Sequence, residues 1–518
     1  MNARTIPEAL LGRAAATPDR IAVTGDQAQL TWSELEELAE RVARSLIGAG
    51  VEAGDRVALW APNSVRWVAA SFGVYMAGAA LVPLNTRFRS AEAAYVVRAS
   101  GARALLTVRD FLDQDFVATA ESWDEVPALE RVVDIGDAKW EAWLTEGDAV
   151  PADTVTARCG RLDGSAVSDI IFTSGTTGAP KGAVLTHGAS IRTYEAWSDC
   201  VGLRGDDRYL VVYPFFHTAG LKSGILACVL KGAEIHPFAV FDVDAVMDYV
   251  ARHRITMLPG PPTVFQSILD HPSFDRFDLS SLRLSVTGAA VVPVEVIRRM
   301  REDLRFETVV TGYGLTETTG TVSMCRHDDS AETIATTVGR PLPGVEVKVV
   351  DDAGTEQPPG QAGEILVRGF NVMKEYFHNP QATREAIDAD GWLRTGDIGF
   401  VGDDGNIRIT DRKKDMYISG GFNVYPAEVE GLILRHPAVA QVAVIGVPDG
   451  RLGEVGQAVV VPRSWADWDE GEFLQWCRDN MANYKVPRHV RLVEALPLNP
   501  SGKVMKYKLR EEAATPRP

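Results

Sequence analysis

Residues 170–187, IIFTSGTTGAPKGAVLTH, join an apolar stretch to a loop of threonine, serine and glycine that is followed by a lysine. The loop offers backbone N–H groups that no large side chain covers, and Lys181 adds a positive charge. Such groups suit the phosphates of a nucleotide. The loop is not a Walker A motif, because Pro180 stands where the second glycine belongs and no Lys-Ser/Thr pair follows. A flexible turn is the alternative interpretation.

Four later segments also place polar residues among glycines or charges. They are TGYGLTETTG (311–320), GWLRTGDIG (391–399), DRKKDMYISGGFNVYPAEVE (411–430) and NPSGKVMKYKLR (499–510). In their order and spacing these segments resemble the adenylate-forming enzymes, which include acyl-CoA synthetases, aryl-CoA ligases, luciferases and the adenylation domains of peptide synthetases. The resemblance runs from the N-terminal region nearly to the C-terminus.

The resemblance implies a reaction in two steps with ATP, Mg²⁺ and coenzyme A. A carboxylate attacks the α-phosphate of ATP and releases pyrophosphate, and a second nucleophile then attacks the acyl carbon of the adenylate. The first step brings an anion to a polyanion, so positive charge must be supplied at the phosphates. The resemblance assigns the β- and γ-phosphates to the first loop. Its predicted contacts are Thr173, Ser174, Gly175, Thr176, Thr177, Gly178 and Lys181.

The segment 311–320 carries the acidic residue of the predicted site. The resemblance places Thr316 at the α-phosphate and Glu317 at Mg²⁺, for which glutamate is a suitable hard oxygen ligand. The adenine and acyl pocket would be lined by Gly312, Tyr313, Gly314 and Leu315, with Tyr313 stacking. A dinucleotide-binding fold is disfavoured, because Glu317 occupies the position of the third glycine in G-x-G-x-x-G.

Three further residues complete the predicted nucleotide site. The resemblance implies that Asp397 accepts the ribose hydroxyl protons and that Arg412 reaches the same sugar or the phosphate. Lys503, in the exposed NPSGK loop, would stabilise the transition state between the carboxylate and the α-phosphate. A structural turn aspartate and a solvated lysine are the alternatives. The predicted catalytic residues are therefore Lys503, Thr316 and Glu317. His217, from the segment predicted to bind the acid, is added to them as a residue beside the carboxylate.

The charged segment DRKKD is interpreted as a hinge. In the family that the chain resembles, a small C-terminal domain rotates about this segment between two catalytic poses, and Lys414 matches the pivot. The rotation would bring Ser419, Gly420 and Gly421 to the adenylate, where glycines leave room for the pantetheine arm of CoA. On composition alone the same segment reads as a solvated turn.

Residues 214–224 (PFFHTAGLKSG) and 286–291 (VTGAAV) are predicted to bind the acid. Amino-acid-activating relatives usually carry an aspartate beside the aromatic residue of the first segment, whereas this chain has none there, so amino acids are disfavoured. Small residues suggest room for a bulky apolar body. They are Ala219, Gly220, Gly288, Ala289 and Ala290, of which the last three also border the predicted nucleotide site. His217 resembles a gate beside the carboxylate, although a packed core histidine is an alternative. Lys222 is expected on the surface rather than at a polar group of the acid.

The sequences of 214–233, 253–283 and 420–430 resemble those of the actinobacterial CoA ligases for polycyclic propanoates from steroid-ring breakdown. The departure HTAGLK in the pocket segment leaves fatty and aryl acids open as substrates. An amide synthetase, which hands the same adenylate to an amine, and a domain that loads a carrier protein are alternatives. A degenerate binding module is disfavoured because the polar residues of all motifs are present.

The elements around these motifs predict an α/β fold. A helix with a capping box at Thr31 and Glu34 is followed by strand-like DRVALWAPN, a helical stretch and strand-like AALVPLN, and the same alternation recurs to about residue 291. Short strands with Gly and Pro turns between about 335 and 410 predict a β-rich subdomain. We therefore expect an N-terminal AMP-binding domain of layered sheets and helices, a hinge, a mobile α+β domain and a disordered tail. Their predicted bounds are 1–410, 411–415, 416–510 and 511–518.

Composition limits the partners and the compartment. A chain of 518 residues exceeds the usual size of one core, and its net charge of −17 argues against general binding to nucleic acid or anionic membranes. Five cysteines without CxxC spacing predict a reducing, cytoplasmic environment. Charges interrupt the apolar runs of the first twenty residues, so we expect neither a signal peptide nor a membrane span. A homodimer is left open.

Overall fold

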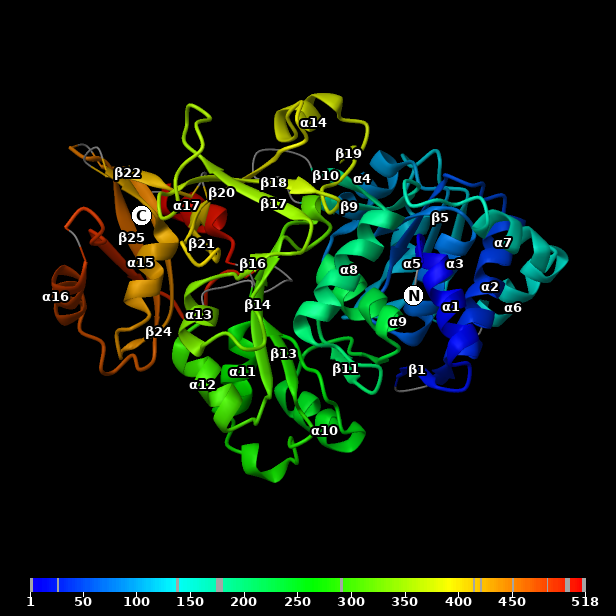
Figure 1. Ribbon diagram of the computed structural model, residues 1–518, viewed down its shortest axis with the longest axis horizontal. Helices are drawn as coiled ribbons and strands as arrows, with labels where there is room; N and C mark the ends of the chain where they lie inside the picture. Colours follow the sequence, from blue (N-terminus) through cyan, green and yellow to red (C-terminus); the bar gives the residue numbers. More distant parts are fainter. Residues whose placement is uncertain are drawn as a thin grey trace.

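The computed structural model describes residues 3–25, 28–136, 139–173, 180–288, 292–412, 415–419, 422–449, 451–481, 483–498 and 504–514. It shows a large N-terminal domain of sheets and helices and a smaller C-terminal domain, drawn in orange and red at the left of Figure 1. The mixed α/β class predicted from the sequence is confirmed.

A seven-stranded sheet forms one layer of the large domain, in the order β19-β10-β9-β4-β3-β5-β8. Its strands are β3 (Arg56–Trp60), β4 (Ala80–Pro83), β5 (Ala104–Thr107), β8 (Arg131–Asp134), β9 (Val167–Thr173), β10 (Lys181–Thr186) and β19 (Glu375–Tyr376). Strands β9, β4, β3, β5 and β8 run parallel. At one edge, β10 pairs antiparallel with β9 and then with β19. Both faces are buried, because Val57 and Leu59 pack into one core and Ala58 and Trp60 into another. Such two-sided burial is usual for parallel strands.

Helices cover this sheet. They are α1 (Ile6–Ala16), α2 (Trp32–Gly48), α3 (Val65–Met76), α4 (Ser90–Ser100), α5 (Phe116–Glu121), α6 (Lys139–Glu146), η1 (Gly147–Ala149), α7 (Ala152–Cys159) and α8 (His187–Val201), with the small hairpin β6 (Asp110–Phe111) and β7 (Gln114–Asp115) beside them. Helix α2 begins with the predicted capping box, in which Thr31 Oγ1 accepts from Glu34 N at 3.2 Å and Glu34 Oε2 accepts from Thr31 N at 2.8 Å. The alternation of strand and helix predicted around α2 and α3 is confirmed.

A second layer consists of two four-stranded sheets, ordered β11-β12-β1-β2 and β13-β14-β15-β16. Its strands are β1 (Ile21–Thr24), β2 (Gln29–Thr31), β11 (Arg208–Val211), β12 (Glu234–Pro237), β13 (Leu284–Thr287), β14 (Thr308–Tyr313), β15 (Ser323–Met324) and β16 (Arg340–Pro341). Between these two sheets, the segment 255–262 forms isolated bridges: Met257 pairs with both Tyr209 and Leu284, and Gly260 pairs with Thr287.

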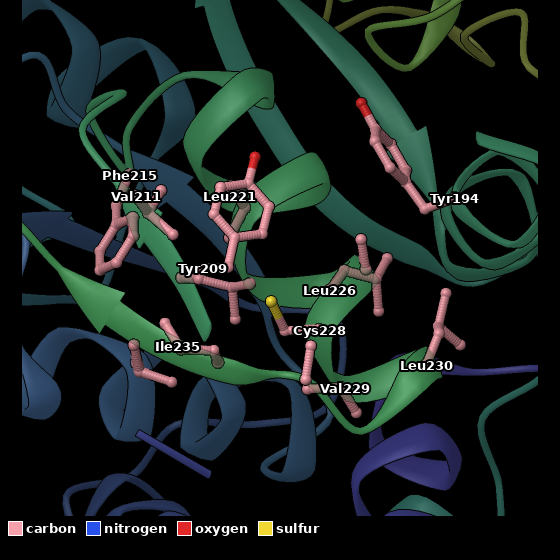
Figure 2. Packing of buried hydrophobic residues seen from close by; sticks show 14 of the residues in the cluster. Tyr194, Tyr209, Val211, Phe215, Leu221, Leu226, Cys228, Val229, Leu230 and Ile235 are labelled. Carbon is pink, nitrogen blue, oxygen red and sulfur yellow. The ribbon is translucent and has the colours of Figure 1, made fainter. Parts of the chain in front are cut away.

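The helices of this layer are η2 (Ala219–Leu226), α9 (Ala227–Lys231), α10 (Val243–His253), α11 (Pro262–Leu269), η3 (Phe274–Arg276), α12 (Val294–Glu302), η4 (Thr316–Thr318) and α13 (Ala331–Thr336). Element η2 is a π-helix, and η3 and η4 are 3₁₀ turns. Figure 2 shows Leu221 and Leu226 of η2 in the core with Tyr209 and Val211 of β11.

The β-rich subdomain predicted near 335–410 is a four-stranded antiparallel sheet in the order β17-β18-β20-β21. Its strands are β17 (Val345–Val350), β18 (Gly363–Gly369), β20 (Leu393–Val401) and β21 (Ile407–Arg412), and α14 (Pro380–Ala386) lies in the connection between β19 and β20. Strand β20 delivers Asp397 toward β14, as described below.

The C-terminal domain has a sheet ordered β23-β22-β25-β24, with β26 paired to β25. Its elements are β22 (Tyr417–Ser419), β23 (Phe422–Val424), α15 (Pro426–Ile433), β24 (Val439–Asp449), β25 (Gly453–Pro462), α16 (Glu470–Asn480), β26 (His489–Leu492) and α17 (Lys506–Ala514). One face packs on α15 and α16 and the other on Leu509 of α17. Helix α17 extends to Ala514, into the segment for which the sequence predicts a disordered tail, because Leu509 is buried.

Among the described residues, no helix has the length and the apolar character needed to cross a membrane.

Candidate active site

A tight turn at the end of β14 presents the predicted acidic residue. Leu315 N donates to Thr318 Oγ1 at 2.9 Å, and Gly320 N donates to Leu315 O at 2.8 Å. The turn needs glycine at position 314, because a Cβ atom there would lie 2.2 Å from Gly320 O. Thr316 and Glu317 lie in η4 at the start of this turn and are partly accessible.

Glu317 is oriented by a strand of the other layer. Tyr376 Oη in β19 donates to Glu317 Oε1 at 2.8 Å, and Met373 N donates to Glu317 O at 2.8 Å. Burial and the Glu317 carboxylate raise the pKa of Tyr376, so its hydroxyl keeps the proton it donates. Lys181 Nζ lies 5.3 Å from the centre of the Tyr376 ring, within cation–π range. The structure thus brings together two predicted residues, Glu317 and Lys181, through a tyrosine that the sequence reasoning missed.

The segment before β19 fixes the rest of the turn. Thr319 Oγ1 donates to Asn371 O at 2.7 Å, and Asn371 Nδ2 donates to Thr321 O at 2.9 Å. Asn371 is fully buried. Sequence reasoning missed Asn371 as well as Tyr376, and the only available signal was the polar asparagine within the apolar wording GFNVM.

Two other predicted residues are directly bonded. Tyr313 Oη donates to Asp397 Oδ2 at 2.5 Å, which joins the end of β14 to β20. Asp397 is 3% exposed, and its backbone N–H donates to Thr395 Oγ1 at 3.0 Å. The backbone of Arg412 pairs with that of Asp397 across β20 and β21. The predicted ribose site therefore lies beside the predicted adenine site.

Gly288 follows β13 at the same edge of the sheet. Strands β13 and β14 are parallel, so both end where an open α/β sheet commonly binds its ligand. Gly288 has φ of +155°, and a Cβ atom there would lie 3.0 Å from Thr311 Oγ1. The glycine allows the backbone at position 288 to pass close to β14.

The two ends of the predicted phosphate loop are adjacent. Lys181 pairs with Thr173 between β10 and β9, and Thr173 Oγ1 donates to Lys181 O at 3.4 Å.

Ser419 is buried and pairs with Phe422 and Gly453 in the C-terminal sheet. The other predicted site residues lie outside the described residues. They are Ser174, Gly175, Thr176, Thr177, Gly178, Ala289, Ala290, Lys414, Gly420, Gly421 and Lys503.

His217 lies two residues before the start of the π-helix η2. Its Nδ1 accepts from Ala219 N at 3.2 Å, and its carbonyl accepts from Gly220 N and Leu221 N at 3.0 and 2.9 Å. The backbone of Pro214 occupies the space beside Gly220, because a Cβ atom on residue 220 would lie 2.2 Å from Pro214 O. Gly220 therefore makes this chain reversal possible and does not by itself enlarge an acyl pocket.

The expectation that Lys222 is a surface lysine is wrong. Its side chain is 0% exposed and forms an ion pair with Asp169, which is also 0% exposed. Burial lowers the pKa of Lys222, and the Asp169 carboxylate opposes that shift. A lysine surrounded by apolar sequence gave no signal of its partner, since Asp169 lies in a different strand far away in the chain.

This geometry defines a class of protein. It is an α/β enzyme in which the turn that carries Glu317 and the buried Asp397 lie beside the carboxyl ends of the parallel strands β13 and β14. The model of the AMP-binding enzyme family matches residues 11–377, and the model of the AMP-binding enzyme C-terminal domain matches residues 428–503.

Known relatives match nearly the whole chain. A 7a-methyl-1,5-dioxo-octahydro-1H-inden-4-yl propanoyl:CoA ligase of Mycobacterium tuberculosis is 48% identical over 98% of this chain and 99% of the relative. The ligase of the same name from Rhodococcus jostii is 46% identical over 98% of both chains.

Solved structures agree. An anthranilate CoA ligase in complex with anthranoyl-AMP has a TM-score of 0.87 at 28% identity, covering 99% of this chain and 98% of the other. An amide bond synthetase from Marinactinospora thermotolerans has a TM-score of 0.85 at 30% identity, covering 98% of this chain and 100% of the other. The chain belongs to the AMP-binding, adenylate-forming enzyme family, and within it to the acyl-CoA synthetase type.

Proposed function

We propose that this protein is an ATP-dependent acid–CoA ligase that acts on a bulky apolar carboxylic acid of the polycyclic propanoate class. The observation that carries the proposal is the similarity, at 46% and 48% identity over 98% of the chain, to two ligases named for a bicyclic propanoate. Two hydrogen bonds, from Tyr313 to Asp397 and from Tyr376 to Glu317, support a nucleotide site at the carboxyl end of β14.

In the first half-reaction, a carboxylate oxygen of the acid attacks the α-phosphorus of ATP. The bond to the β-phosphate oxygen breaks, and pyrophosphate leaves. Negative charge gathers at the α-phosphate, where Thr316 and Lys503 would stabilise it, while the loop that ends at Lys181 holds the β- and γ-phosphates. Asp397, held by Tyr313, accepts hydrogen bonds from the ribose hydroxyls.

The residues present fit a Mg²⁺ ion. Glu317 is a hard oxygen ligand, and the hydrogen bond from Tyr376 fixes its orientation at the exposed side of the turn. When bound, Mg²⁺ neutralises charge on the phosphates. The role of Tyr376 is to hold the Glu317 carboxylate in place, with Lys181 on the face of the tyrosine ring.

In the second half-reaction, the CoA thiolate attacks the acyl carbon, and AMP leaves with the former carboxylate oxygen. We assign the hinge to 411–415 with Lys414 as pivot, between the domains 1–410 and 416–510. Two observations support this division: β21 ends at Arg412, and the next strand, β22, belongs to the C-terminal sheet. Arg510 of α17 also pairs with Asp415 at 2.7 Å, so the last residue of the proposed hinge is tied to the C-terminal domain.

An amide synthetase is the competing function, because its first half-reaction needs the same residues. The amide bond synthetase noted above is 30% identical to this chain, well below the two CoA ligases. The difference favours CoA over an amine as the acceptor.

The test is ATP–pyrophosphate exchange with a panel of acids, followed by analysis of products. The panel should include a bicyclic propanoate, linear fatty acids and aryl acids. We expect the highest kcat/KM with the bicyclic propanoate and a thioester when CoA is supplied. Exchange with no acid of the panel would contradict the proposal, and amide formation from amines at a higher rate than thioester formation would replace it.

A further inference from the structure

Lys222 is a fully buried charged side chain in the segment 214–224, which is predicted to bind the acid. It lies in the middle of η2, a π-helix of 8 residues, at 0% exposure. π-Helices are rare, mostly occur as single turns and are frequently found at functional sites. The roles proposed above for the site residues, which concern the nucleotide and the metal, do not use this lysine.

The partner of Lys222 is Asp169, in the centre of β9. Lys222 Nζ donates to Asp169 Oδ2, which also accepts from Ser168 Oγ at 2.5 Å. Tyr75 Oη donates to Asp169 Oδ1 at 2.6 Å, and the Lys222 ammonium lies 5.6 Å from the centre of the Tyr75 ring. The charges of the lysine and the aspartate balance, and each carboxylate oxygen has a donor.

The pair connects two segments that border the site. Asp169 precedes Thr173 on β9, where the predicted phosphate loop begins. Lys222 follows Thr218, the residue that precedes η2. A Cβ atom on Gly320 would lie 2.9 Å from Thr218 Cβ, so the turn that carries Glu317 packs directly on the first turn of η2.

The two segments differ in how firmly they are held without the pair. Strand β9 is fixed by backbone hydrogen bonds to β10 along its length and by pairing with β4. Element η2 belongs to no sheet. Its packing on the core shown in Figure 2 is mainly apolar, through Leu221 and Leu226, and Ser223 adds one neutral hydrogen bond with Tyr209. Apolar contacts are not directional, so they allow a helix to rotate or slide, whereas a charged hydrogen bond fixes one orientation.

A buried ion pair contributes little net stability compared with an apolar pair of similar volume, because desolvating both charges is costly. A role in fixing one arrangement is therefore a better explanation for Lys222 than a role in stability. The sheet supplies a rigid reference through Asp169, and η2 is the element whose position is set.

We propose that the Lys222–Asp169 ion pair is a positioning pair that holds the first turn of η2, with His217 and Thr218, against the Glu317 turn and so determines how the acid is bound. This inference rests on the proposed function, because it assumes that residues 214–224 bind the acid. It makes Lys222 a specificity-determining residue that does not touch the substrate.

The test uses the double variant K222M/D169N, which replaces both charges by neutral side chains of similar size and leaves no unpaired buried charge. We expect the KM for the acid in ATP–pyrophosphate exchange to rise at least about tenfold, and the preference for a bicyclic over a linear acid to fall, while the KM for ATP changes less than about twofold. A matched control is R283M/D207N, which removes another largely buried ion pair. Asp207 and Arg283 lie at the amino ends of β11 and β13, whereas the candidate site lies at the carboxyl ends of the strands. We expect this control to keep the acid preference.

A second variant covers the case in which the double variant does not fold. Y75F removes only the hydrogen bond to Asp169 Oδ1 and is expected to raise the KM for the acid about threefold with the KM for ATP unchanged. Unchanged acid parameters in the folded variant, or equal rises in both KM values, would overturn the positioning role. If instead the wild-type protein activates no acid of the panel, the proposed function fails, which is a distinct result.

Discussion

Tyr376 and Glu317 lie 59 residues apart in the chain, yet the tyrosine hydroxyl donates a 2.8 Å hydrogen bond to the glutamate carboxylate. Tyr376 belongs to β19, the edge strand of the seven-stranded sheet, whereas Glu317 follows β14 in the other layer. The proposed metal ligand is therefore oriented from the sheet that also carries the two ends of the phosphate loop. We expect this arrangement to couple the positions of the proposed metal ion and of the phosphates.

Replacing Tyr376 with Phe tests that coupling. The change removes one hydrogen bond to a carboxylate, which is worth about 1.5–3 kcal/mol, so we expect adenylation to slow by about ten- to a hundredfold at low Mg²⁺. Titration of the exchange rate with Mg²⁺ should show that a higher concentration is needed for half-maximal rate. The matched control is Y249F. This variant removes a hydroxyl that is hydrogen-bonded to His236 at 3.1 Å, in a part of the fold away from the site. An unchanged Mg²⁺ dependence in Y376F would contradict the assignment of Glu317 to the metal.

Replacing Tyr313 with Phe is expected to act on the nucleotide instead. Without the 2.5 Å hydrogen bond from Tyr313, Asp397 is less firmly oriented toward the ribose, so the KM for ATP should rise about tenfold. The Mg²⁺ dependence should stay as in the wild type. Initial rates of exchange over a range of ATP concentrations measure the change, and the same shift in both tyrosine variants would show that the two bonds serve one common function rather than two.

Much of this arrangement could be predicted from the sequence, for physical reasons that are local. The capping box at Thr31 and Glu34, the apolar spacing of α2 and the buried strand β3 each depend on residues that are close in the chain. Tyr313 and Asp397 were assigned to adjacent parts of one nucleotide by resemblance, and the structure places them in contact.

The interactions that escaped prediction are all between distant segments. Tyr376 meets Glu317, and Lys222 meets Asp169, only after two sheets have formed and packed together. The π-helical form of η2 has no sequence period of its own in this apolar stretch, and it turns Lys222 inward where a surface lysine was expected. A buried charge is therefore not recognisable until its partner is located.

His187 gives a prediction about stability and pH. Burial lowers its pKa to about 4, while the Nδ1 atom accepts a hydrogen bond from Ile6 N at 3.3 Å. Between about pH 4 and the ordinary histidine pKa of about 6.5, the unfolded chain binds a proton at this residue that the folded chain does not bind. Its contribution to the free energy of unfolding is therefore lost as the pH falls through this range, by about 3 kcal/mol in total.

The measurement is urea unfolding between pH 7 and pH 4.5 for the wild type and for His187→Asn. Asparagine keeps an acceptor for Ile6 N but does not titrate, so the variant should lose less free energy of unfolding than the wild type on acidification. His489→Asn changes an exposed histidine and serves as control. Parallel pH profiles for the wild type and His187→Asn would show that His187 is protonated in the folded protein.

Lys503→Ala tests the proposed transition-state charge. Loss of one preorganised charge should reduce adenylate formation by at least about a hundredfold, as measured by ATP–pyrophosphate exchange. Reaction of separately supplied acyl-adenylate with CoA should be much less affected. Lys508→Ala, which removes an exposed lysine of α17, is expected to change neither half-reaction. An equal loss in both half-reactions of Lys503→Ala would argue against the assigned role and for misfolding.

Lys414→Pro tests the proposed hinge without altering a reacting atom. Proline fixes φ near −65°, so it restricts the backbone rotation that the two poses require. The variant should retain ATP–pyrophosphate exchange while thioester formation collapses, because a domain held in the adenylating pose cannot bring Gly420 and Gly421 to the acyl carbon. Lys414→Ala is the control, since it removes the same side chain but leaves φ free, and it should keep both half-reactions. Thioester formation at the wild-type rate by a folded Lys414→Pro protein would exclude rotation about this residue, because the constrained backbone would then be compatible with the whole reaction.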